Sequence, residues 1–124
     1  MLHSTLSGGG MSSPSSITVA TSGNSWVSSY LSAVSEFSPA GISGNGINQS
    51  FGMALDTKGN VWISNQRATL SSGLGDITEL NASAQAIAAA IASGGIDYPV
   101  AVTADSNGNM WIVNYGSSRV TLFI

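Results

Sequence analysis

The few side chains that could do chemistry in this sequence of 124 residues do not form a catalytic set. It holds one histidine, His3, and no cysteine, which excludes disulfides, thiolate zinc sites and cysteine nucleophiles. Serine is abundant, but a serine nucleophile needs a positioned base. His3 falls in a start for which we predict little structure. We therefore predict no catalytic residue and no cofactor in this chain, apart from a cation site considered next.

One acidic turn has the pattern of metal ligands. Asp105, Asn107 and Asn109 place side-chain oxygens at alternate positions, as in half of a calcium loop. A hard divalent cation suits such ligands, but a calcium loop also needs later carboxylates, including a bidentate Glu, and these are missing. In the alternative, the Asp accepts hydrogen bonds from backbone amides and the glycine of the turn adopts positive φ. The same turn explains residues 56–60, so we favour it for both copies.

The turn belongs to a sequence motif, here called the phrase, that occurs three times with Gly, Asn and Trp in fixed order. An apolar run enters each turn and a β-branched and aromatic run leaves it, which is typical of a hairpin. Each Trp then falls on a strand that must bury one large ring, so we expect the rings to pack adjacent layers together. The first copy has Ala20 where the others have Asp, and we expect its turn to be the loosest. The structural repeat residues are Gly23, Asn24 and Trp26; Asp56, Gly59, Asn60 and Trp62; and Asp105, Gly108, Asn109 and Trp111.

Further strands surround each phrase. Alternating segments follow at 34–37, 77–80 and 120–123, and weaker fourth segments at 40–42 and 85–91. Segment 82–92 is rich in Ala and reads as a helix when taken alone, but its place in the repeat favours an edge strand. The Trp residues are 36 and 49 residues apart, at positions 26, 62 and 111. Four antiparallel strands per repeat of this length indicate a β-propeller blade, so we predict an all-β chain with repeats at about 7–42, 43–92 and 93–124.

The repeated pattern resembles a known family. Gly-Asn-x-Trp-Val/Ile, preceded by an Asp turn and a Gly-rich loop and followed by Val-Ser/Thr-Glu-Phe/Leu, is similar to the NHL-type repeats of bacterial β-propellers, including those related to streptogramin B lyase. The resemblance covers about residues 7–124 and implies about three four-stranded blades. Such propellers range from enzymes to binding scaffolds.

The resemblance also implies where chemistry would be. Streptogramin lyase-like enzymes are expected to use a histidine near the ring centre, but His3 precedes the repeats. Gluconolactonase-type propellers are expected to hold a divalent ion with Glu, Asn and Asp. Of the repeat residues, Asn65 and Asn114 could face the axis, and acidic partners would have to come from elsewhere.

The ends of the sequence complement each other. Residues 1–6 stand where the repeat expects an outer strand, and the sequence stops at Ile124, after a third strand. Two explanations stay open. The chain is a piece of a longer propeller, or two copies form a six-bladed ring in which residues 1–6 of each complete the other's last blade.

Composition limits the partners. Three basic residues stand against six acidic ones, giving a net charge of -3, which argues against nucleic acid and anionic membrane surfaces. No apolar run approaches the ~20 residues of a membrane span, and the first residues lack the basic and apolar regions of a signal peptide. The Ser-, Gly-, Asn- and Thr-rich composition favours an extracellular or periplasmic location.

We therefore predict a non-catalytic β-propeller module that presents loops to a ligand or protein. The alternative is part of a streptogramin lyase-like or gluconolactonase-like enzyme whose catalytic residues lie outside this chain. Expected partners are a second copy, the remaining blades of a longer chain, or a small molecule or protein that the sequence does not identify.

Overall fold

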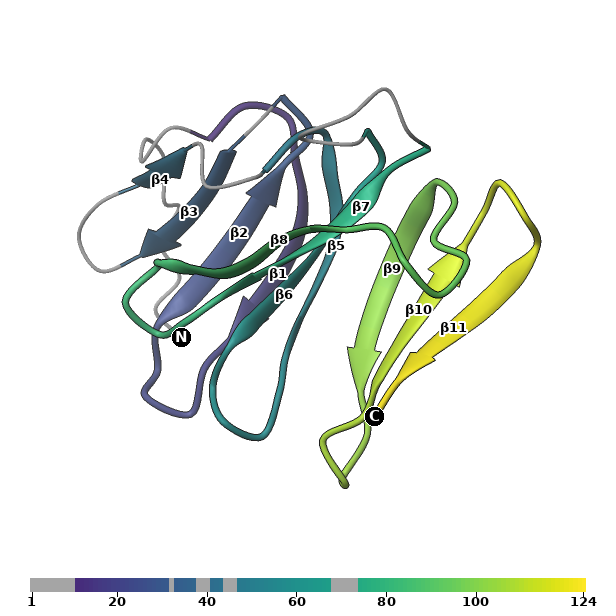
Figure 1. Cartoon of the computed structure of the whole chain (residues 1–124). Helices are drawn as coiled ribbons and strands as arrows, with labels where there is room; N and C mark the ends of the chain where they lie inside the picture. The colour runs from purple at the N-terminus through teal and green to yellow at the C-terminus, as the bar shows by residue number, and fades with distance from the viewer. Residues whose placement is uncertain (1–10, 32, 38–40, 44–46, 68–73) are drawn as a thin grey trace, which may run out of the picture.

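A computed structural model describes residues 11–31, 33–37, 41–43, 47–67 and 74–124. These residues form eleven strands in three antiparallel sheets (Figure 1). None of them forms a helix long and apolar enough to cross a membrane. The strands are β1 (Pro14–Val19), β2 (Ser25–Ser29), β3 (Ala33–Phe37) and β4 (Gly41–Ser43) in the first sheet; β5 (Ser50–Leu55), β6 (Val61–Asn65), β7 (Asp76–Leu80) and β8 (Ala86–Ile91) in the second; and β9 (Pro99–Ala104), β10 (Met110–Asn114) and β11 (Arg119–Phe123) in the third.

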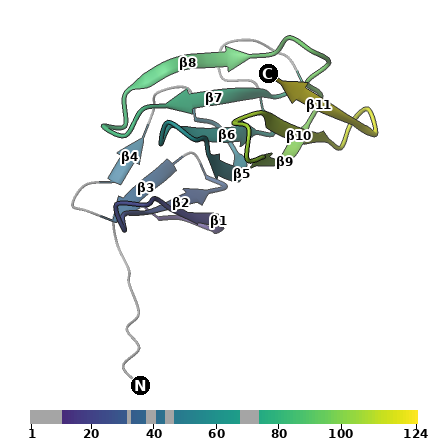
Figure 2. The same ribbon diagram turned by 90° about the horizontal axis from the view of Figure 1, so that it is seen from below.

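Each sheet is a meander in which spatial order follows chain order. The first strands of the three sheets, β1, β5 and β9, lie next to one another. The later strands step outward from them, which Figure 2 shows for β5 to β8. Sheets that fan out in this way from a common axis are blades of a β-propeller. The all-β, partial propeller that we predicted is confirmed.

The Ala-rich segment 82–92 contains β8, which pairs antiparallel with β7. Residues 86–91 are thus an edge strand and not a helix, as their place in the repeat predicted, because pairing with the neighbouring strand β7 outweighs the helix propensity of alanine. The first sheet runs from Pro14 to Ser43, the second from Ser50 to Ile91 and the third from Pro99 to Phe123. Residues 1–6, expected to form a spare outer strand, lie outside the described residues.

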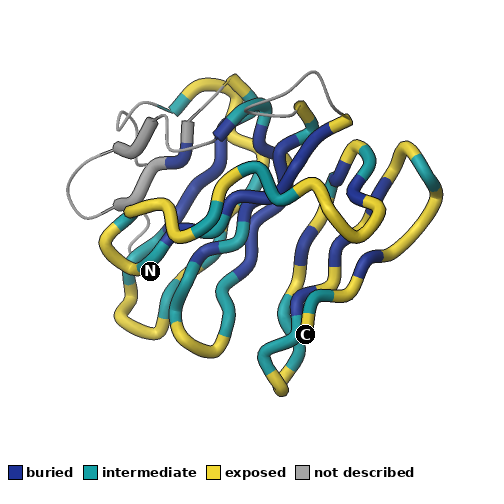
Figure 3. The backbone as a smooth tube through the Cα atoms, in the orientation of Figure 1, coloured by how far each residue is buried: buried dark blue, intermediate teal, exposed yellow. Residues whose placement is uncertain are grey.

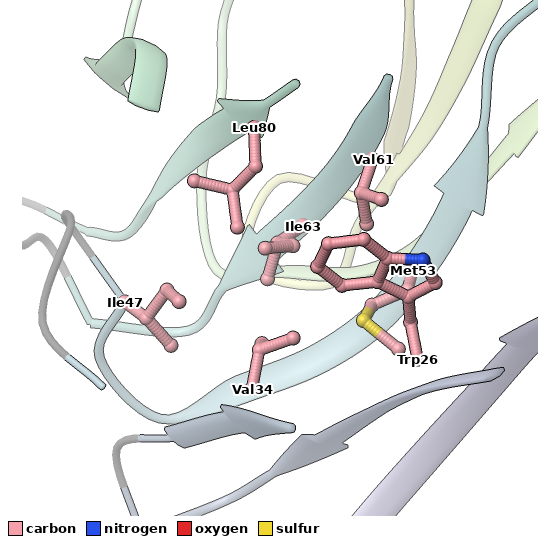
Figure 4. Close-up of a cluster of buried hydrophobic side chains, with 7 residues drawn as sticks. All are labelled: Trp26, Val34, Ile47, Met53, Val61, Ile63 and Leu80. Atoms are coloured by element: carbon pink, nitrogen blue, oxygen red, sulfur yellow. The ribbon is translucent and has the colours of Figure 1, made fainter. Parts of the chain in front are cut away.

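Two apolar layers between the sheets form the core, and the middle sheet contributes to both, as its dark blue strands in Figure 3 show. Burying a large aliphatic side chain contributes about 1.5–3 kcal/mol, so these layers hold the sheets together. The first layer consists of Trp26, Val34, Ile47, Met53, Val61, Ile63 and Leu80 (Figure 4). The second consists of Ala54, Ile77, Ile96, Val102, Met110 and Ile112, with Trp62 and Phe123 packed at its edge.

The three Trp rings differ in burial. Trp26 is 2% exposed and lies in the first layer. Trp62 is partly buried and its ring centre lies 6.0 Å from that of Phe123. Trp111 is 40% exposed, because no described sheet covers its side of the third sheet. The expected packing role therefore holds for two rings, and Trp111 departs from it.

Candidate functional site

The repeated Asp turns connect the first two strands of each sheet. In the second sheet, Asp56 Oδ1 accepts hydrogen bonds from the backbone amides of Lys58 at 2.8 Å and Asn60 at 2.9 Å. Asp56 Oδ2 accepts from Asn60 Nδ2 at 3.1 Å and from Trp62 Nε1 at 3.2 Å. Gly59 has φ of 84°, as the turn requires. The carboxylate therefore shapes the turn and also fixes the indole six residues later.

The turn of the third sheet repeats these contacts. Asp105 Oδ1 accepts from the amides of Asn107 and Asn109, at 2.9 and 3.0 Å, and Oδ2 accepts from Asn109 Nδ2 at 2.8 Å and Trp111 Nε1 at 3.2 Å. Gly108 has φ of 85°. The hydrogen bond from the Asn109 side chain, with those from Trp111 and the backbone, lowers the pKa of Asp105 to about 2. For a cation to bind at Asp105, Asn107 and Asn109, it would have to displace these donors.

The carboxyl of Asp56 accepts the same kinds of hydrogen bond and is more buried than that of Asp105. Partial burial by itself would raise the pKa of this carboxyl. The hydrogen bonds from Asn60, Trp62 and Lys58 together outweigh burial and leave the pKa below its usual value. No three Asp, Glu, His or Cys residues gather as metal ligands anywhere in the described part of the chain.

The first turn lacks the carboxylate but keeps the backbone. Gly23 has φ of 89°, its amide donates to the Ala20 carbonyl at 2.8 Å, and the Ala20 amide donates to the Asn24 carbonyl at 2.8 Å. The Gly-Asn pair thus suffices for the turn. The Asp adds the side-chain contacts that hold the Trp ring.

A polar side chain at the end of each second strand anchors the loop that enters the sheet. Asn65 Oδ1 accepts from the Asn48 amide at 3.0 Å, and Asn114 Oδ1 accepts from the Asp97 amide at 3.1 Å. In the first sheet the Ser29 hydroxyl accepts from an amide 17 residues earlier, at 3.3 Å, and both Asn pairs have the same separation of 17. We call Ser29, Asn65 and Asn114 the loop anchors.

The two Asn anchors also reach the third strand of their own sheet. Asn65 Nδ2 donates to Thr78 Oγ1 at 2.9 Å and Asn114 Nδ2 donates to Thr121 Oγ1 at 3.0 Å. Both Asn side chains are buried. We expected that these residues could face the axis. Their amides bind backbone and hydroxyl groups inside the sheet, and Asn65 Nδ2 also donates to the buried Asp76 carboxylate, so a cation there would have to displace these partners. The spacing of 17 residues was the sequence signal for this role.

The other end of the sheets carries the longer connections. In an antiparallel meander, the loops between second and third strands emerge at the same end as the loops between sheets, opposite the Asp turns. This end lies at the top of Figure 1. We call it the loop face. Its described residues are 11–13, 30–31, 47–49, 66–67, 74–75, 93–98 and 115–118, together with the first residues of β1, β5 and β9.

Each sheet starts at the loop face with the same unusual backbone. The residue before the first strand has a positive φ in all three sheets: 54° at Ser13, 49° at Gln49 and 46° at Tyr98. Such conformations cost non-glycine residues about 1–3 kcal/mol and cluster at functional sites. Sequence reasoning missed them because Ser, Gln and Tyr carry no signal for a left-handed backbone.

A β-bulge follows each of these residues. The pairing of the first and second strands skips one residue each time, which leaves Ser15, Phe51 and Val100 unpaired. Bulges redirect side chains and are frequent beside functional sites. Because these residues lie on the innermost strands, the bulges place them where the axis opens onto the loop face.

Large exposed apolar side chains gather at this face. They come from loops and bulges of all three sheets: Leu31, Phe51, Leu74, Tyr98 and Tyr115, the last of which is 75% exposed. Phe51 meets Tyr30 edge to face, with ring centres 6.1 Å apart, across the boundary between the first two sheets. Among the described residues the loop face contains no histidine. Its described large exposed side chains are thus mostly apolar and aromatic.

Hydrogen bonds between sheets hold this surface in place. Ser15 Oγ donates to the Ser50 carbonyl at 2.9 Å, and Ser50 Oγ donates to the Ser29 carbonyl at 2.9 Å. Between the second and third sheets, the Tyr98 amide donates to the Leu74 carbonyl. The loop-face residues thus lie on backbone segments that are hydrogen-bonded between the first and second sheets and between the second and third sheets.

No family model matches the chain, and no curated protein matches it. Solved structures do. The chain is similar to a catalytically inactive His-to-Ala variant of virginiamycin B lyase from Staphylococcus aureus with quinupristin, at 16% identity and a TM-score of 0.63, over 89% of this chain and 40% of that one. It is also similar to the selenomethionine form of that lyase, at 15% identity, a TM-score of 0.58 and the same coverage, and to a streptogramin B lyase, at 14% identity and 0.52, over 86% of this chain and 39% of that one. The chain thus has the β-propeller fold of these lyases and spans about 40% of their length.

Proposed function

We propose that this chain is a non-catalytic propeller module whose loop face binds a partly apolar ligand beside the ring axis. The observation that carries the proposal is the group of exposed apolar side chains on bulges and loops of all three sheets. Single exposed apolar residues are ordinary, but several at one end of the molecule favour an interaction site there. The hydrogen bonds between sheets support it further, because a site fixed in advance loses less entropy when its ligand binds.

The histidine content supports the non-catalytic part of the proposal. The lyase variant in which one histidine is replaced by alanine is described as catalytically inactive. This sequence has a single histidine, His3, which precedes the three sheets. A histidine base at the loop face would have to come from outside the described residues.

The second candidate function is part of a lyase-like or lactonase-like enzyme. The shared fold and the coverage of about 40% of the lyase chains favour it. Its catalytic residues would then lie on blades outside this sequence, with the loop face supplying one wall of the site.

Quinupristin is a suitable first probe, because one similar lyase structure contains it. The experiment follows amide shifts by NMR while the chain is titrated with quinupristin and, separately, with a set of aromatic fragments. Chromatography then tests whether the quinupristin is recovered unchanged. We expect shifts confined to the loop face and unchanged quinupristin.

Two variants and one control make the assay specific. Phe51→Ala and Tyr115→Ala should each weaken binding about 3- to 10-fold, the loss of an aromatic contact of roughly 0.5–1.5 kcal/mol. Ile87→Ala removes an apolar side chain from β8, away from the loop face, whose exposure lies between those of Phe51 and Tyr115, and should leave binding unchanged. Binding insensitive to Phe51→Ala and Tyr115→Ala would refute the site. Conversion of quinupristin would refute the non-catalytic assignment and favour the enzyme.

A further inference from the structure

The two junctions inside the chain share one design. Each sheet has a forward face, directed toward the next sheet, and a back face, directed toward the preceding one. The second-strand Trp occupies the forward face: Trp26 packs with Met53 and Ile63 of the second sheet, and Trp62 packs against Met110 and Phe123 of the third. A forward face with a Trp therefore pairs with a back face of aliphatic side chains.

The forward face of the third sheet has the same design but no described partner. Trp111 pairs in register with Leu122, and Val113 with Val120, as Trp62 pairs with Glu79 and Ser64 with Ile77 in the second sheet. All four side chains of the third sheet are 40–59% exposed. Leu122 stands where the second sheet has a glutamate, so the free face is more apolar than its internal counterpart.

The back face of the first sheet is the matching half. Ile17 pairs with Val27, in the position of the pairs Met53–Ile63 and Val102–Ile112, which are buried in the two junctions. Ile17 is 65% exposed and Val19 is 59% exposed. The forward face of the third sheet has the Asp105 carboxylate at its edge, where it accepts from Trp111 Nε1. No charged side chain is described on the back face of the first sheet, so no like charge opposes it there.

We propose that the forward face of the third sheet binds the back face of the first sheet in a second copy of this chain. The contact repeats a junction that the chain already makes twice, with Trp111 against Ile17 of the other copy; Val27, which pairs with Ile17, is already buried within one chain. It is a head-to-tail contact, so two copies make it twice and surround the axis with six sheets. The second copy supplies the wall that three sheets leave open beside the loop face. This proposal does not depend on which ligand, if any, the loop face binds.

Two charge-introducing variants test the contact, each on one of its halves. Trp111→Glu disables the forward face and Ile17→Glu disables the back face, both at exposed positions where the fold tolerates a polar side chain. Light scattering during size-exclusion chromatography should give about twice the 12.5 kDa chain mass for the unmodified chain and the single mass for each variant. Ile87→Glu, at an apolar residue of the second sheet that is 53% exposed and lies outside both faces, should keep the double mass.

Mixing the two variants separates this contact from any other. Trp111→Glu retains its back face and Ile17→Glu retains its forward face, so an equimolar mixture should regain the double mass through one intact junction. Circular dichroism and thermal melting of each variant establish that it is folded. The proposal is overturned if the unmodified chain is a monomer at 100 μM or grows without limit on concentration. It is equally overturned if Ile17→Glu alone dimerises, or if the mixture does not.

Discussion

Replacing the loop anchor Asn65 with alanine should destabilise the protein more than any other anchor substitution. Asn65 is fully buried and joins three groups: it accepts from the Asn48 amide and donates to Asp76 Oδ1, at 2.8 Å, and to Thr78 Oγ1. Asp76 is itself 1% exposed, so its carboxylate would lose a donor in a site that water does not reach. Alanine supplies neither the acceptor nor the donor.

The expected magnitude follows from these contacts. A buried polar group that loses its partner costs about 1–3 kcal/mol, and a charged group costs more. For Asn65→Ala, with one backbone amide, one hydroxyl and one carboxylate affected, we expect a loss of about 3–5 kcal/mol. Asn114→Ala affects one backbone amide and one hydroxyl, so about 2–3 kcal/mol is expected. Ser29→Ala removes one hydrogen bond of 3.3 Å, and we expect about 1 kcal/mol or less.

Urea unfolding followed by tryptophan fluorescence measures the free energy of unfolding of each variant, with equal slopes as the check on two-state behaviour. Amide hydrogen exchange adds a local readout, because the Asn48 amide should exchange much faster in Asn65→Ala. If Asn65→Ala does not fold, the order of Asn114→Ala and Ser29→Ala still tests the reasoning. A loss below 1 kcal/mol for Asn65→Ala, or an equal loss for Ser29 and Asn114, would refute the anchoring role.

Three further predictions concern the turns and the close approach of two sheets. The pKa of Asp105 falls from 3.8 to about 2 on folding, so its stabilising contribution is present above about pH 4 and is lost as the pH falls through about 2. Asp105→Asn should therefore flatten that part of the profile of melting temperature against pH. An unchanged profile would contradict the turn contacts. Gly52→Ala should destabilise by about 1–3 kcal/mol in urea unfolding, since its Cβ would lie 2.9 Å from the Ala101 Cα across the second junction. Gly59→Ala has open space but φ of 84°, so it should cost the ~1–2 kcal/mol of a left-handed backbone. No measurable loss for Gly52→Ala would be at odds with a tight junction. Ser118→Gly should stabilise by about 0.5–1 kcal/mol in the same assay, because Ser118 is exposed and has φ of 54°; a destabilised variant would show that its side chain has another role.

Much of the fold could be predicted because it depends on contacts between residues that are close in the sequence. The Gly-Asn-x-Trp phrase, the positive φ of its glycine and the Asp that accepts from the amide two residues on are all local, and the structure has them. Repetition of the phrase then implied equivalent sheets. Segment 86–91 shows the limit of propensity, since only its place in the repeat identified it as a strand.

The candidate site was far less predictable. Phe51, Tyr98 and Tyr115 are ordinary aromatic residues in the sequence, separated by up to 64 positions between the first and the last. What makes them a surface is the bulge and the left-handed residue at the start of each sheet, and neither has a composition signal. Our attention to Asp105 and its neighbours as metal ligands selected the opposite end of the sheets, where the carboxylate is bound by N–H donors.

The sequence by itself determined the turns, because each turn depends on hydrogen bonds and steric limits within a few residues. Through the repetition of the turns it also indicated the strands and the number of sheets. Only the tertiary structure decided which of the equivalent residues are buried. Trp26, Trp62 and Trp111 share one motif, yet their exposure depends on whether another sheet lies against them. The same holds for Asn65, whose amide has the same chemistry in any strand and becomes an anchor because a loop 17 residues earlier folds over it. Whether a side chain is buried or hydrogen-bonded depends on two segments that meet in space, and the repeated motif describes only one of them.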